Sequence, residues 1–320
     1  MSGTDTDTDA DDAADTGTDA DDAPDTGTDA DDAPGTGGIR AMLDRVADRM
    51  AGATALERIA IGFASTTLAL ALGSVVVAAT GYDAVEFVTS LVAGAVGSES
   101  NIAFTLRQST MLVLTGVAVA IAFRAGVFNI GVQGQFVVGG FATSVAILFF
   151  APHLPEGTTG GVLLMVLGAL AAMLAGGAYA ALPGLMKAYA GANEVITTIM
   201  LNFIASGVVY FLIDEYFRPA GTSAPNTERF PDYVELPSIV FDSPSFSVVG
   251  LGVALAAVVL VAVLMSRTRF GYDLVTSGHQ QSAAAYSGVD PERTVVTTMT
   301  LSGVVAGLAG AVFAIMILGY

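Results

Sequence analysis

The chain has 320 residues, of which 53% are hydrophobic and 13% charged, with a mean hydropathy of +0.67. Soluble domains carry about twice that share of charge, so the composition excludes an ordinary soluble protein and indicates a helical membrane protein. The net charge is −18, but 13 of the 30 acidic residues lie between Asp5 and Asp32. A basic surface for nucleic acid is absent, and with no cysteine and two histidines we expect no metal centre.

The first 38 residues are an acidic repeat in which a ten-residue unit recurs at 8–17, 18–27 and 28–37. Asp, Thr, Gly and Ala cannot bury enough apolar area to offset the entropy of ordering, so we expect a disordered tail. Residues 39–58 carry four arginines and predict an amphipathic segment on the cytoplasmic surface. The remaining residues, 59–320, form the predicted transmembrane domain.

Seven apolar runs are long enough to cross a bilayer, which predicts an all-α polytopic membrane protein. They cover residues 59–80, 102–123, 132–150, 161–183, 195–213, 247–265 and 294–318. The run 82–97 is shorter, and we interpret it as a re-entrant or interfacial helix. The fourth span is rich in Ala and Gly, which allow helices to approach closely in lipid.

Lysine and arginine give the predicted orientation. With the amino terminus in the cytoplasm, nine basic residues fall inside and three outside, as the positive-inside rule requires. The inside residues are Arg40, Arg45, Arg49, Arg58, Arg124, Lys187, Arg267, Arg269 and Arg293, and the outside ones are Arg107, Arg218 and Arg229. This orientation makes 214–246 external and 266–293 cytoplasmic.

Two polar stretches interrupt the apolar spans. Arg124–Gln135 holds three glycines and the amides Asn129, Gln133 and Gln135, and such groups at membrane depth require protein or water partners. It is either a polar hairpin at the membrane surface or a polar site. In the second stretch, Asn202 follows Asn193 and Glu194 on one helical face, where it either bonds a neighbouring helix or contacts a substrate.

The predicted cytoplasmic segment 266–293 is long for a simple connection. Within it, residues 283–288 read Ala-Ala-Ala-Tyr-Ser-Gly, which predicts a short helix that Gly288 ends. A short helix parallel to the membrane is suited to docking a soluble partner.

Four blocks together resemble the permeases of ABC importers for simple sugars and nucleosides, in the superfamily that includes branched-chain amino acid and ribose permeases. The blocks are Arg124–Gln135 (Arg-Ala-Gly-Val-Phe-Asn-Ile-Gly-Val-Gln-Gly-Gln), Gly191–Asn202, Gly278–Val289 and Leu301–Gly310. The resemblance covers residues 55–320. Gln133 departs from a usual Glu, Gln280 from a common Asn, and Ser282 from a frequent basic residue or Pro.

The resemblance implies an importer-type permease bundle in the cell membrane rather than an enzyme, with no catalytic residue and no directly bound cofactor. A separate cytoplasmic ABC ATPase would use ATP, a second and different permease subunit would complete a hetero-dimer, and an external substrate-binding lipoprotein would deliver the cargo. Such permeases usually continue with further helices, so we expect carboxyl-terminal helices to be missing from this chain.

The implied cargo is a nucleoside or a simple sugar, whose hydroxyls suit uncharged amides. The pathway candidates are Asn129, Gln133, Gln135, Asn193, Glu194 and Asn202, and the residues expected to contact the ATPase are Gly278, Ala283, Ala284, Tyr286 and Gly288. One alternative is a branched-chain amino acid as cargo, with Arg124 and Glu194 as its charged partners. The other is a membrane subunit that does not transport.

Overall fold

The computed structural model describes residues 54–237, 240–241 and 246–320. The predicted acidic tail, and the segment 39–58 up to residue 53, lie outside these residues. The chain divides into two compact units, Met1–Tyr82 and Asp83–Tyr320. The described part of the first unit is essentially one helix, and the second unit holds all of the candidate site residues.

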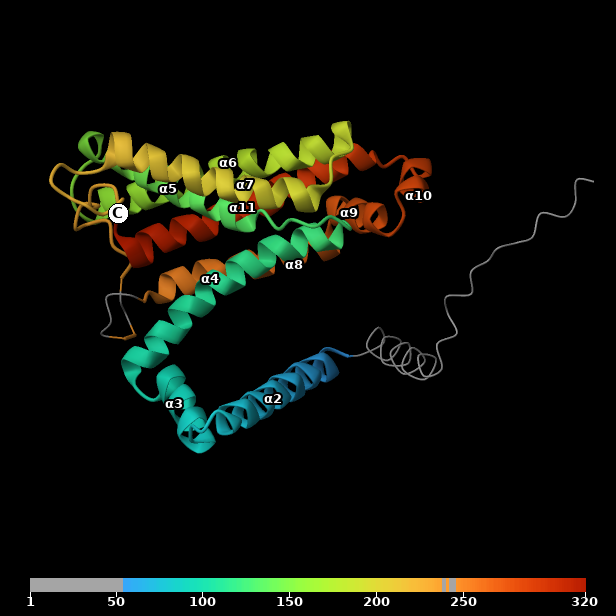
Figure 1. The fold of residues 1–320 in the computed structure, drawn as a ribbon. Helices are drawn as coiled ribbons and strands as arrows, with labels where there is room; N and C mark the ends of the chain where they lie inside the picture. The colour runs from blue at the N-terminus through green and yellow to red at the C-terminus, as the bar shows by residue number, and fades with distance from the viewer. Residues whose placement is uncertain (1–53, 238–239, 242–245) are drawn as a thin grey trace, which may run out of the picture. The chain divides into compact units, whose positions relative to one another are not determined.

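Within the described residues, seven helices are long and apolar enough to cross a membrane, which confirms the predicted all-α polytopic fold (Figure 1). They are α2 (Ala55–Ala79), α4 (Glu99–Arg124), α5 (Val132–Phe150), α6 (Thr158–Ala190), α7 (Glu194–Leu212), α8 (Val248–Arg267) and α11 (Pro291–Phe313). The shorter helices are α3 (Ala84–Val96), α9 (Arg269–His279) and α10 (Gln281–Tyr286). Helix α3 is the predicted short apolar helix, and Asp83 caps its first turn.

Helix α2 begins at Ala55, four residues before the predicted span and inside the segment 39–58. Thr54 and Glu57 set this start through a capping box. The Glu57 carboxylate accepts a hydrogen bond from the Thr54 backbone N–H at 2.7 Å, and the Thr54 hydroxyl accepts one from the Glu57 N–H at 3.4 Å. The reciprocal bonds satisfy N–H groups that have no partner within the helix.

Helix α6 is longer than the sequence predicted. The predicted span ended at Pro183, yet the helix continues through this buried proline to Ala190. Proline removes one backbone hydrogen bond, but membrane helices tolerate that loss when neighbouring helices enclose it. The helix ends instead at Gly191, whose positive φ of 64° suits a residue without a Cβ.

Helix α11 is the centre of the second unit. Buried residues make up 61% of its apolar window, against 17–33% for the other spans of this unit. It packs on α4, α5 and α6, and its glycines bring its backbone into direct contact with α5 and α6. A Cβ on Gly307 would overlap the carbonyl oxygen of Ala172, and one on Gly310 would overlap that of Phe136. The small residues predicted to mediate close packing therefore do so against α11.

The two ends of the second unit differ in their structure. Figure 1 shows α9 and α10 at one end and the carboxyl terminus at the other. At the terminal end, α7 and α11 each continue into a π-helical turn, Ile213–Phe217 and Ala314–Leu318. The described part of the loop after α7 is bound to this end, where the Phe230 N–H donates to the Gly319 carbonyl oxygen at 2.8 Å.

Replacing Gly307 with valine should prevent normal packing of α11, because the new side chain would overlap the backbone of α6. Forced overpacking of this kind costs about 1–3 kcal/mol or more of folding stability. We expect a lower melting temperature and a lower yield of monodisperse protein in detergent. Gly252→Val in α8 is the matched control, since a Cβ there meets no atom within 4 Å. Equal stability of the two variants would contradict the proposed packing.

Candidate functional site

The loop 125–131, between α4 and α5, is the point where elements distant in sequence meet. Gly126 has a positive φ of 68°, and its backbone lies against that of Gly278 at the end of α9. A Cβ on Gly278 would lie 2.7 Å from the Arg124 carbonyl oxygen, so only glycine fits this contact. The loop is therefore held directly against the segment that the sequence predicts to face the ATPase.

Asn129, in this loop, is completely buried and connects three helices. Its Nδ2 donates to Gln135 Oε1 at 3.0 Å and to Ser302 Oγ at 2.8 Å. Its Oδ1 accepts from Gln135 Nε2 at 3.0 Å and from the Gly131 N–H at 3.1 Å. The Ser302 hydroxyl in turn donates to the Ala118 carbonyl oxygen of α4 at 2.6 Å. One amide thus links the loop to α5 and α11, and Ser302 carries the connection to α4.

Asn202 connects α7 to the same region. Its Oδ1 accepts from the Gly134 N–H at 2.8 Å, and its Nδ2 donates to the Ile130 carbonyl oxygen at 2.9 Å. Gly134 is in the first turn of α5, and the residue before that helix, Gly131, has no side chain to cap it. Asn202 therefore supplies from another helix the capping bond that the local sequence lacks.

The start of α5 lies inside the bundle rather than at its edge. Asn202 is eight residues beyond the first residue of α7, which places it roughly 12 Å along that helix. Within the polar stretch, Gly131, Gly134 and Gln135 are buried, whereas Phe128, Ile130 and Gln133 are exposed. Both amide atoms of Asn129, Gln135 and Asn202 bond the chain itself. Their hydrogen bonds give these three pathway candidates a structural role.

The other pathway candidates lie apart from this network. Asn193 is exposed and caps α7, accepting from the Val195 and Ile196 N–H groups at 2.9 and 3.2 Å. Gln133 is exposed in the first turn of α5, and its side chain makes no hydrogen bond with another described residue. Of the five candidate amides, only Gln133 has both side-chain polar atoms free within the described structure, whereas Asn193 uses its Oδ1 as a cap.

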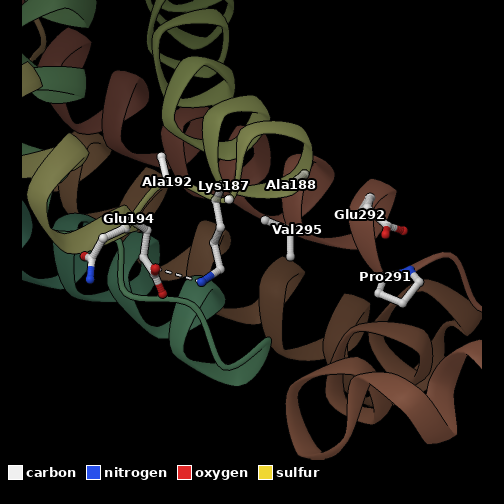
Figure 2. A pocket seen from close by; sticks show the side chains of 9 residues that line it. Lys187, Ala188, Ala192, Glu194, Pro291, Glu292 and Val295 are labelled. Atoms are coloured by element: carbon white, nitrogen blue, oxygen red, sulfur yellow. Dashed lines mark ion pairs between the residues drawn. The ribbon is translucent and has the colours of Figure 1, made fainter.

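Glu194 forms an ion pair with Lys187 that bridges α6 and α7, with Nζ and Oε2 2.7 Å apart. Lys187 lies near the carboxyl end of α6 and Glu194 at the amino end of α7. Each charge therefore also interacts favourably with the dipole of its own helix. Both line a cavity of about 410 Å³ that also includes Pro291 and Glu292 (Figure 2). Glu194 is therefore neutralised by a partner from within the chain.

The segment 268–290 contains more structure than the sequence predicted. Besides the expected short helix, α10, it contains α9, whose Leu274 is fully buried against residues of α4 and α11. Gly288 follows α10 with a φ of 83°, which confirms its predicted role as a helix stop.

The expected contact residues of this segment differ in exposure. Tyr286 is 95% exposed, whereas Ala284 is fully buried, so the side chain of Ala284 faces the protein and not a partner. The sequence does not reveal this, because a six-residue helix has too little periodicity to show which face is covered. Nor does it reveal the role of Ser302, although that residue lies within the block Leu301–Gly310. Nothing is described of the Ala283 side chain.

Replacing Asn129 with leucine should destabilise the bundle, because it leaves the buried amide of Gln135 and the Gly131 N–H without their partner. Each buried polar group left unsatisfied costs about 1–3 kcal/mol. We expect the melting temperature in detergent to fall by several degrees, whereas Gln133→Leu, at an exposed position, should change it little. A similar melting temperature for both variants would show that Asn129 does not hold the bundle together.

A family model matches this chain over residues 101–320, and its description is the permease component of a branched-chain amino acid transport system. The guanosine ABC transporter permease protein NupP of Bacillus subtilis is 32% identical, over 80% of this chain and 72% of that protein. The glucose ABC transporter permease protein TsgB13 of Haloferax volcanii is 32% identical, over 76% of this chain and 64% of that protein.

The nucleoside ABC transporter permease protein NupB of Lactococcus lactis is 30% identical, over 76% of this chain and 66% of that protein. The matched region thus spans about two thirds of the length of these relatives. No solved structure matches the chain significantly. The family match covers all of the described second unit except its first helix and the start of α4, and it includes the whole amide network. The chain therefore belongs to the family of ABC transporter permease components.

Proposed function

We propose that this chain is one of two membrane-spanning subunits of an ATP-driven importer for a nucleoside or simple sugar. The observation that carries the proposal is the family match over 101–320, together with relatives named for guanosine, nucleosides and glucose. These cargoes are uncharged and rich in hydroxyl groups. The spans suit such cargoes, because they carry few charges to attract an ion.

A branched-chain amino acid is less suited to the described spans. A zwitterion requires a cation and an anion that are both available, or the ends of helices in their place. Glu194, one of the two charged partners that this alternative needs, is already paired with Lys187 within the chain. That pairing favours the neutral cargo over this alternative.

The complete importer would contain three further kinds of subunit. A cytoplasmic ATPase would supply energy, a second permease would complete the pathway, and an external binding lipoprotein would deliver cargo. In this arrangement the amino terminus and α9–α10 face the cytoplasm, as the distribution of Lys and Arg predicts. Among the described side chains of α10, Tyr286, which is exposed beside the buried Ala284, is best placed to enter a groove on the ATPase.

The contacts around loop 125–131 provide a physical route between ATPase and pathway. A movement of α9 would reach the loop through the backbone contact of Gly278 with Gly126. The loop would transmit this movement to α5 and α11 through the hydrogen bonds of Asn129. It would transmit it to α7 through the bond between the Ile130 carbonyl oxygen and Asn202. Close-packed elements of this kind transmit displacement because they cannot deform freely.

Cells that lack this permease should lose uptake of labelled guanosine or of labelled glucose, and expression of the chain with its partner subunits should restore it. Leucine uptake should stay unchanged in both strains. The measurement is the initial uptake rate at substrate concentrations near physiological levels. Loss of leucine uptake alone would assign the cargo to branched-chain amino acids. Unchanged uptake of all three would support the subunit that does not transport.

Tyr286→Ala should weaken binding of the ATPase, because it removes the exposed aromatic ring of α10 without disturbing the buried side of that helix. Interface aromatics commonly contribute more than 1 kcal/mol, so we expect at least a fivefold loss of co-purified ATPase and of uptake. Tyr216→Ala, 69% exposed in the π-helical turn after α7, is the matched control and should bind normally.

Orientation can be checked in the same system, because the chain has no cysteine. A cysteine at Ser223 should react with an impermeant thiol reagent applied outside intact cells, and one at Ser287 should not. Full ATPase binding by Tyr286→Ala, or labelling of Ser287→Cys from outside, would place the ATPase contact elsewhere.

A further inference from the structure

A second cavity, of about 270 Å³, lies at the opposite end of the unit from α9 and α10. Its walls come from α5, the end of α7, the loop residues 225–227 and the end of α11. It is separate from the amide network and from the cavity beside Lys187. Its volume is below the roughly 300 Å³ at which pockets for drug-sized ligands begin, so it suits one ring system rather than a large molecule.

The lining of this cavity is mainly apolar and aromatic. Phe136 of α5 and Phe313 of α11 pack with ring centroids 5.2 Å apart and planes inclined by 56°. Phe141, one turn further along α5, packs edge-on against Phe217 with centroids 5.4 Å apart. These contacts hold the Phe136, Phe141 and Phe313 rings in fixed orientations while they remain only partly buried. Fixed aromatic faces favour stacking with a flat ring.

The cavity also contains a polar group whose hydrogen-bonding needs are unmet. Asn226 Oδ1 is buried and has no hydrogen-bond partner among the described residues. A buried amide oxygen without a partner is costly, so its retention needs an explanation. The Asn side chain presents a carbonyl acceptor beside an NH₂ donor. It can therefore bond the edge of a heteroaromatic ring that carries an N–H donor beside an acceptor atom. Such a ring would satisfy the group that the chain leaves unsatisfied.

Two π-helical turns meet at this cavity. Ile213 begins the turn after α7, and Ala314 and Leu318 begin and end the turn after α11. π-helical turns inside or at the end of α-helices are uncommon and occur frequently at functional sites. Their presence on two different walls of one cavity points to the same place as the aromatic rings and Asn226.

We propose that this cavity binds the base of a nucleoside, with the base against the phenylalanine rings and its polar edge at Asn226. The proposal rests on the proposed importer function and makes it more specific, because a simple sugar has no flat aromatic face to stack. The cargo class is then nucleosides rather than sugars.

Tryptophan fluorescence tests this binding site directly, because the chain contains no tryptophan. Phe141→Trp places a reporter in the wall, and the difference spectrum between variant and wild-type complexes isolates its signal. Guanosine should quench this signal, and ribose at the same concentration should not. Phe211→Trp, on an exposed ring of α7 outside the cavity, is the control and should respond to neither.

Uptake measurements separate this site from the importer function. Phe141→Leu and Asn226→Ala should each raise the KM for guanosine about 5- to 100-fold, while Phe211→Leu leaves it unchanged. Uptake of guanosine at the wild-type KM by both cavity variants, or no quenching, would overturn the base site and keep the importer. Quenching in a complex that transports neither nucleoside nor sugar would keep the site and overturn the importer proposal.

Discussion

The first turn of α5 imposes the constraint on which much of the second unit depends. Its backbone N–H groups have no partner within the helix, and the helix begins inside the bundle, where water is scarce. The residue before it, Gly131, has no side chain to accept a bond. Asn202 from α7 satisfies Gly134, and Asn129 from the loop satisfies the N–H of Gly131. The positions of α7 and of the loop relative to α5 follow from these bonds.

Close glycine packing and the amide network act on the same helices in different ways. Gly303, Gly307 and Gly310 bring α11 into backbone contact with α5 and α6, which gives dispersion contacts but little directional preference. Ser302, next to Gly303, makes hydrogen bonds with Asn129 and Ala118, and these bonds set the orientation of α11. Together they fix both the distance and the rotation of α11, the most buried helix of the unit.

The sequence predicted the spans well because apolar runs of membrane length are a strong signal. All seven appear in the structure, and the largest difference is in α6, which continues past Pro183 to Ala190. The sequence also located the polar stretches and the Gly288 stop. Residue types alone did not show how those stretches are used, because partners such as Ser302 are more than 170 residues from Asn129.

Candidate site residues were harder to predict than the fold. An amide in a membrane span suits a substrate and a neighbouring helix equally well, and only three-dimensional contacts decide between them. In this structure Asn129, Gln135 and Asn202 each bond other parts of the chain. The aromatic cavity was not anticipated, because phenylalanines spread along α5 and α11 look like ordinary lipid-facing or core residues until the helices are assembled.

The central claim is that side chains from other segments cap the start of α5 inside the bundle. Hydrogen exchange at the backbone amides of residues 131–135 tests it directly, with wild-type protein compared with Asn202→Ala. The account predicts strong protection in the wild type, and faster exchange at Gly134 in the variant while the middle of α5 stays protected. Wild-type exchange as fast as in the exposed turn at Gly221, or identical protection in both proteins, would contradict it.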